Sequence, residues 1–195
     1  MGRIPLLILS DNPASSTGLA RITRELCLRI HAELSDTFEL ATYGLGGVSS
    51  KKFGWSQYVI NRMENWSIPD LPRVWQDFAG EKKGIAMFVW NPSWVPWVAD
   101  CEKLPNGTLK DFLRTKPFER WGYFPVDAEG PNGKLPQEVA DVIVRFDRPL
   151  MYTQWASDLL QKTNGFVAPH LPHGTDTKIF IRGTGRRCER RLWGR

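Results

Sequence analysis

Short apolar segments alternate with longer segments of helical periodicity along most of this chain. The first pair is the apolar run over residues 5–9, followed by residues 18–34, where apolar side chains recur at every third or fourth position. Residues 84–90 (GIAMFVW) are apolar throughout, which predicts a strand that is buried on both faces. Such strands alternating with helices are typical of a parallel sheet covered on both sides. The sequence therefore predicts an α/β fold with a doubly wound parallel sheet.

The alternation continues to residue 174. We expect further strands at residues 38–43, 57–60, 120–124, 149–153 and 165–174, and helices at residues 71–78, 108–114, 135–146 and 156–163. Each crossover between parallel strands should be right-handed. In an open sheet of this kind, the functional loops lie at the carboxyl ends of the strands.

The charged residues are divided unevenly between the body of the chain and its end. The chain has 195 residues and a formal net charge of +5, and six arginines with Glu189 in residues 181–195 account for all of this excess. Residues 1–180 hold 20 basic and 20 acidic side chains. A basic tail can bind polyanions, but a neutral body gives no strong signal for nucleic-acid binding.

Neither the cysteines nor the apolar runs predict a special class of protein. The cysteines at 27, 101 and 188 form no Cys-x-x-Cys pair, and the three histidines add no metal-ligand spacing, so we expect no metal site. No run approaches the roughly 20 apolar residues of a membrane span. Residues 4–9 are also too short for the apolar part of a signal peptide. The sequence favours a cytoplasmic protein without a transmembrane segment.

Polar and aromatic residues follow the predicted strands. The sets are Thr17 and Gly18 after the first strand, Asn91 and Trp94 after residues 84–90, Asp127 and Glu129 after residues 120–124, Trp155 after residues 149–153, and His173 near the end of the last one. Because the carboxyl ends of parallel strands meet at one edge of a sheet, these residues predict one candidate cleft.

Residues 10–18 are a strand-to-helix turn with a single glycine. A glycine at a helix start lets a ligand approach the backbone, where free N–H groups and the helix dipole favour an anion. Both the Gly-x-Gly-x-x-Gly pattern of dinucleotide sites and the Walker A pattern are missing. Two interpretations remain open: Gly18 belongs to a binding loop, or it only helps the chain to turn.

Four stretches in this order resemble the family 4 (group 1) glycosyltransferases of the GT-B fold. They are SDNPASSTGLARITREL, YFPVDAEG, YTQWASDLL and PHLPHGTDTKIF, at residues 10–26, 123–130, 152–160 and 169–180. The resemblance covers most of residues 3–180 and corresponds to the N-terminal half of such an enzyme. It implies a Rossmann-like, acceptor-side domain at residues 1–180, with residues 181–195 as a basic tail that begins an interdomain linker or helix.

The resemblance also implies an activity. Enzymes of this family transfer a sugar from a nucleotide-sugar donor to an acceptor hydroxyl with retention of configuration, and they generally need no metal or other cofactor. Their C-terminal domain binds the donor, so this chain alone should be poorly active unless a separate donor domain joins it. The alternative is a non-catalytic domain of the same fold that binds a carbohydrate, a nucleotide or another protein.

Roles for single residues follow from the same resemblance. Gly18 would face the donor phosphates or the reacting sugar, with Arg21 one turn into the helix, and Asp127 would orient or deprotonate the acceptor hydroxyl. The alternative is that the Asp127 side chain caps the turn in which it lies. Trp94 and Trp155 could stack on a sugar ring, although aromatic side chains also fill cores. The complete predicted set is Asp127 as catalytic residue, with Thr17, Gly18, Arg21, Asn91, Trp94, Glu129, Trp155 and His173 as substrate-binding residues.

Overall fold

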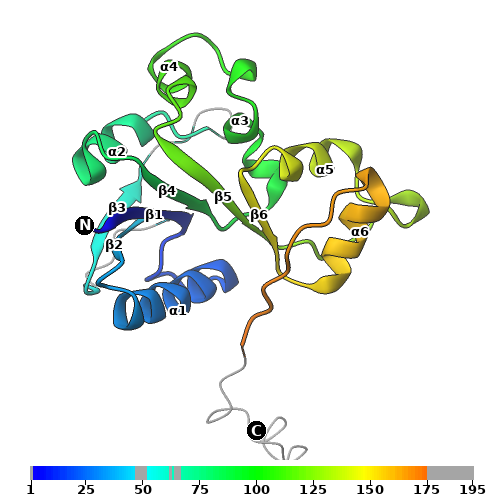
Figure 1. Cartoon of the computed structure of the whole chain (residues 1–195), viewed down its shortest axis with the longest axis horizontal. Helices are drawn as coiled ribbons and strands as arrows, with labels where there is room; N and C mark the ends of the chain where they lie inside the picture. Colours follow the sequence, from blue (N-terminus) through cyan, green and yellow to red (C-terminus); the bar gives the residue numbers. More distant parts are fainter. Residues whose placement is uncertain (1, 47–51, 62, 64–66, 175–195) are drawn as a thin grey trace, which may run out of the picture.

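The structure, a computed structural model, describes residues 2–46, 52–61, 63 and 67–174. Six strands form one sheet: β1 (Ile4–Asp11), β2 (Phe38–Leu45), β3 (Ser56–Ile60), β4 (Gly84–Phe88), β5 (Phe118–Phe124) and β6 (Arg148–Met151). Their order is β3-β2-β1-β4-β5-β6, and every neighbouring pair is parallel (Figure 1). The predicted doubly wound, Rossmann-like α/β fold is therefore confirmed. The basic tail at residues 181–195 lies outside the described residues, as does the end of the PHGTDTKIF stretch.

Strand β1 lies at the centre of the sheet and is buried on both faces. Successive side chains of a strand point to opposite faces, so Leu7 and Leu9 pack on one side while Leu6 and Ile8 pack on the other. All four side chains are at most 4% exposed. This two-sided burial explains why the run is apolar throughout instead of alternating with polar residues.

The helices cover both faces of the sheet. They are α1 (Gly18–Glu33), α2 (Leu71–Ala79), α3 (Pro96–Ala99), α4 (Thr108–Arg114), α5 (Gln137–Val144) and α6 (Gln154–Asn164), with short 3₁₀ helices η1 (Pro92–Trp94), η2 (Cys101–Lys103) and η3 (Pro131–Gly133). Helix α1 packs on one face, where its Cys27 joins Leu6 and Ile8 in the core. The other long helices contribute to the larger core on the opposite face, and Figure 1 shows α1 on its own side of the sheet.

The predicted last strand, residues 165–174, is wrong. The segment makes only one isolated parallel bridge, between Met151 and His170. The Met151 N–H donates to the Pro169 carbonyl at 2.9 Å, and the Leu171 N–H donates to the Met151 carbonyl at 2.8 Å. Pro169 has no N–H to donate, so the ladder cannot continue toward residue 165. On the other side the chain after β6 turns into α6, with Thr153 as the cap of that helix. Segment 165–174 therefore lies beside β6 without extending the sheet.

No helix in the described part of the chain is both long and apolar enough to cross a lipid bilayer.

Candidate functional site at the carboxyl edge of the sheet

A cavity of about 460 Å³ opens where the carboxyl ends of several strands meet the start of α1. Asp11 ends β1, Asn91 and Trp94 follow β4, Pro125 and Asp127 follow β5, Tyr152 follows β6, and α1 contributes its cap Thr17 and the residues Gly18, Leu19 and Ile22. Five of the nine predicted site residues thus line one hollow, which we call the edge cavity. The sheet topology brings them together, because the segments that follow β1, β4, β5 and β6 all start at this edge of the parallel sheet.

The start of α1 is fixed by a short chain of hydrogen bonds. Thr17 caps the helix, since its hydroxyl oxygen accepts a hydrogen bond from the Ala20 N–H at 3.1 Å. The same hydroxyl donates to the Asp11 carboxylate at 2.5 Å. The Trp90 indole N–H donates to the other Asp11 oxygen at 3.3 Å. Asp11 thereby ties the loop that precedes α1 to the ends of β1 and β4.

Two glycines near this loop have opposite structural roles. A Cβ on Gly44, near the end of β2, would lie 2.5 Å from the Asn12 Cα, so only glycine lets the loop approach β2 this closely. A Cβ on Gly18 would meet no described atom within 4 Å, and the residue has no positive φ. The described structure therefore gives no steric reason for glycine at position 18. Both interpretations of Gly18, as part of a binding loop and as an aid to the turn, therefore stay predictions.

Asn91 and Trp94 come from the turn after β4. The Asn91 side-chain oxygen accepts a hydrogen bond from the Ser93 N–H at 2.9 Å and so caps η1. This cap holds Trp94 at the edge cavity, where its side chain is only partly buried. The neighbouring Trp90 and Trp97 are 1% and 4% exposed and belong to the core.

Asp127 lies in the loop after β5 and is exposed at the edge cavity. Its carboxylate makes no hydrogen bond or ion pair with any residue in the described part of the chain. The alternative that Asp127 caps its own turn is therefore not observed among these residues. Both carboxylate oxygens are left with lone pairs that can accept hydrogen bonds from a ligand hydroxyl.

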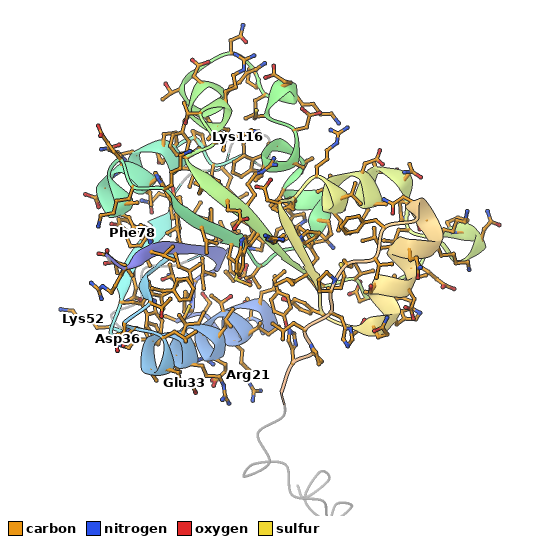
Figure 2. All side chains as sticks on the ribbon, viewed as in Figure 1. Arg21, Glu33, Asp36, Lys52, Phe78 and Lys116 are labelled. Carbon is orange, nitrogen blue, oxygen red and sulfur yellow. The ribbon has the colours of Figure 1, made fainter. Side chains whose placement is uncertain are left out.

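Three predicted residues lie outside the lining of the edge cavity. Arg21 is exposed on α1, and Figure 2 shows its side chain directed away from the sheet. Helical geometry explains this, because the lining positions 19 and 22 lie on one side of α1, and position 21 projects about 100° from position 22 and about 160° from position 19. Glu129 is exposed two residues beyond Asp127. Trp155, on the first turn of α6, is 43% exposed.

His173 contacts the edge cavity indirectly. Its ring packs edge-on against Tyr152, with ring centroids 4.2 Å apart, and against Tyr123 at 5.6 Å. Tyr123 also donates a hydrogen bond from its hydroxyl to the Leu171 carbonyl at 2.7 Å. Burial lowers the pKa of His173 below its usual 6.5. The neutral imidazole is therefore the main form of His173 at neutral pH.

The sequence analysis missed Tyr152, which lines the edge cavity. Its hydroxyl oxygen is buried and has no hydrogen-bond partner among the described residues. Burial raises the pKa of the Tyr152 phenol well above its usual 10, so the group stays protonated. Tyr152 was predicted to lie within a strand, but β6 ends one residue earlier, at Met151.

Asp11, Leu19, Ile22 and Pro125 also line the edge cavity without having been predicted as site residues. For Asp11 a signal existed, because it is the second residue after the first apolar run. Within the described residues, no three His, Cys, Asp or Glu side chains gather where a metal ion could be held. Cys27 is buried in the core, and burial raises the pKa of its thiol to about 12.

A second cavity, of about 370 Å³, lies at the opposite edge of the sheet. It is formed by the end of α1, including His31, and by the chain before β3, including Trp55. None of the predicted site residues lines it.

A scan against protein-family models and a search of curated proteins both find no match to this chain.

Proposed function

We propose that this domain is the acceptor-binding half of a retaining glycosyltransferase. In this proposal, the edge cavity holds a hydroxyl-bearing acceptor, and a nucleotide-sugar donor is bound by a separate C-terminal donor domain. No metal or other cofactor takes part, and the protein acts in the cytoplasm. The observation that carries the proposal is that Gly18 and Asp127, from two of the stretches that resemble the family, line the same cavity.

The chemistry of the edge cavity supports this assignment. The Asp127 carboxylate has unused acceptor capacity among the described residues, as a group must have if it is to orient or deprotonate an acceptor hydroxyl. Trp94 adds an aromatic surface of the kind on which a sugar ring packs. The open space at Gly18 leaves room for an acceptor beside the first turn of α1. Arg21, Glu129 and Trp155 have no part in the proposed site.

A binding measurement on the full chain tests the proposal. We expect the methyl glycosides of common hexoses, titrated by calorimetry and by ligand-observed NMR, to include at least one that binds. Replacement Asp127→Asn should weaken its binding about tenfold, since a hydrogen bond to a charged group contributes roughly 1.5–3 kcal/mol. Asp36→Asn is the matched control, because Asp36 is an exposed carboxylate in the turn after α1, at the opposite end of this helix from the edge cavity (Figure 2).

Two results would contradict the proposal. One is that none of the glycosides binds. The other is that Asp127→Asn and Asp36→Asn bind the sugar as tightly as the unaltered chain does.

The alternative of a non-catalytic carbohydrate-binding domain rests on the same cavity. Release of nucleoside diphosphate from a panel of nucleotide-sugars, measured with the bound glycoside present, separates the two functions. Release that depends on Asp127 supports transfer. Sugar binding without release, even after supplying a donor domain from a related enzyme, supports the non-catalytic alternative.

A further inference from the structure

The described lining of the edge cavity contains negative charge and no positive charge. Its ionisable groups are the carboxylates of Asp11 and Asp127 and the phenol of Tyr152, which burial keeps protonated. The remaining described lining residues are uncharged, and none is a lysine, arginine or histidine. A ligand in this cavity therefore meets two carboxylates and no described cation.

The cations near α1 do not offset this charge. Arg21 points away from the sheet (Figure 2). The Arg24 guanidinium donates to the Pro13 carbonyl at 2.9 Å and lies 3.9 Å from the Glu25 carboxylate. His173, behind Tyr152, is mainly neutral at neutral pH. Each of these groups is directed elsewhere or carries little charge.

A carboxylate of the protein itself already offsets part of the positive charge at the N-terminal end of the α1 dipole. A helix N-terminus ordinarily attracts an anion. Here the Asp11 carboxylate already holds the capping residue Thr17, so a negative charge is present at this end before any ligand arrives. A phosphate placed in the cavity would approach this carboxylate as well as Asp127, and like charges at close range repel.

We propose that the edge cavity selects an acceptor whose bound part is rich in hydroxyl groups and carries no phosphate or carboxylate. A neutral sugar unit donates hydroxyl hydrogens to carboxylates such as Asp127, and an amino sugar adds an attractive cation. The phosphate group of a sugar phosphate replaces one hydroxyl donor by acceptor oxygens and adds negative charge. This inference rests on the proposed function, and it favours a free neutral sugar or a polysaccharide end over a phosphorylated sugar or a polynucleotide.

The experiment compares sugars that differ only in charge. Glucose, galactose and mannose, their 2-amino forms and their 6-phosphates are titrated into the full chain at pH 7 and low salt. For the hexose that binds, we expect the 6-phosphate to bind at least tenfold more weakly than the neutral sugar. The 2-amino form should bind as tightly or more tightly.

Variants assign the discrimination to the cavity carboxylates. The affinity for the neutral sugar divided by the affinity for its 6-phosphate should fall at least threefold in Asp127→Asn. Asp36→Asn should leave this affinity ratio unchanged. Asp11→Asn should act in the same direction as Asp127→Asn if its melting temperature shows that it is folded. Because Asp127 is exposed and makes no bond to described residues, its variant tests the inference even if Asp11→Asn does not fold.

The outcomes separate the two proposals. A 6-phosphate that binds as tightly as the neutral sugar, or more tightly, overturns the charge selection and leaves the glycosyltransferase proposal standing. The charge selection is also overturned if Asp127→Asn and Asp36→Asn change the affinity ratio equally. If no sugar of any charge binds, the proposed function fails and the inference fails with it.

Discussion

Carboxylates are paired on one side of this domain and unpaired at the edge cavity. Around β5 and the helices beside it, Asp147 lies 2.9 Å from the Arg120 guanidinium, and Asp100 lies 2.6 Å from that of Arg145. Glu102 receives two hydrogen bonds from a third arginine, at 2.7 and 2.8 Å. Each of these acidic groups has a cationic partner within the fold.

The carboxylates of the edge cavity have no such partners in the part of the chain that the structure describes. Asp11 accepts hydrogen bonds from the neutral donors Thr17 and Trp90, and Asp127 accepts none from the described residues. The two regions therefore use the same chemical group for different purposes. Paired carboxylates hold neighbouring segments together, whereas the Asp127 carboxylate makes no such link between the described segments.

The largest effect should come from disturbing the loop that carries Asp11. Gly44→Ala places a Cβ against the Asn12 backbone, so either β2 or the loop must move. We expect a loss of about 2 kcal/mol in the free energy of unfolding, in the range of overpacked sites. Urea denaturation followed by circular dichroism measures it.

Gly18→Ala provides the matched comparison for Gly44→Ala. Its added methyl group meets open space at a helix start, so the free energy of unfolding should stay within about 0.5 kcal/mol of the unaltered chain. If the two variants are destabilised equally, the close approach of β2 to the Asp11 loop is not what fixes this region.

A smaller effect should distinguish the two classes of carboxylate directly. Asp147→Asn removes the pair with Arg120, and we expect it to lower the free energy of unfolding by about 1 kcal/mol, because solvent screens a pair at the surface. Asp127→Asn should change it by less than about 0.5 kcal/mol. Equal destabilisation by both variants would mean that Asp127 also supports the fold.

The pH dependence of the folding stability should also differ between the paired carboxylate of Asp147 and the carboxylate of Asp127. The Arg120 guanidinium holds the pKa of the Asp147 carboxyl below its usual 3.8. The stabilisation by this pair is therefore complete at neutral pH and is lost as the pH falls through the lowered pKa. In acid unfolding experiments, the pH-dependent stabilisation by this pair should be missing from Asp147→Asn. It should still be present in Asp127→Asn.

The smallest expected effect concerns His173. Since burial lowers its pKa, the folded state favours the neutral imidazole, and the packing of His173 on Tyr152 should be most stable above pH 6.5. It should weaken as the pH falls below this value. NMR titration of the His173 ring should give a pKa below 6.5, and a value at or above 6.5 would show that the ring is not packed as described.

The fold follows from local patterns to a large extent. Two-sided burial of β1 makes residues 5–9 apolar, and such apolar strands alternating with helices predict a parallel sheet. Helix α4 begins and ends at the predicted residues, and the other predicted helices agree within two residues at each end. The last predicted strand failed because apolar character was given more weight than Pro169, which interrupts the hydrogen-bond ladder on one side. On the other side the ladder ends where α6 begins.

The candidate site was predictable in part. The rule that strand ends converge correctly brought Gly18 and Asp127 to one cavity. Their roles stay predictions. The direction of Arg21 could have been read from the helical period of α1, but no sequence pattern tells that Asp127 lines the cavity while Glu129 does not. The position of Tyr152 depends on tertiary packing against Tyr123, which connects residues far apart in the sequence.

The most direct test of the central claim is to map where a neutral sugar binds. Amide chemical shifts of the ¹⁵N-labelled full chain are followed while the tightest-binding methyl glycoside is added. The account predicts shifts at Gly18, Asn91 and Asp127, around the edge cavity, and none at His31 or Trp55. Shifts confined to the second cavity, around His31 and Trp55, would contradict it.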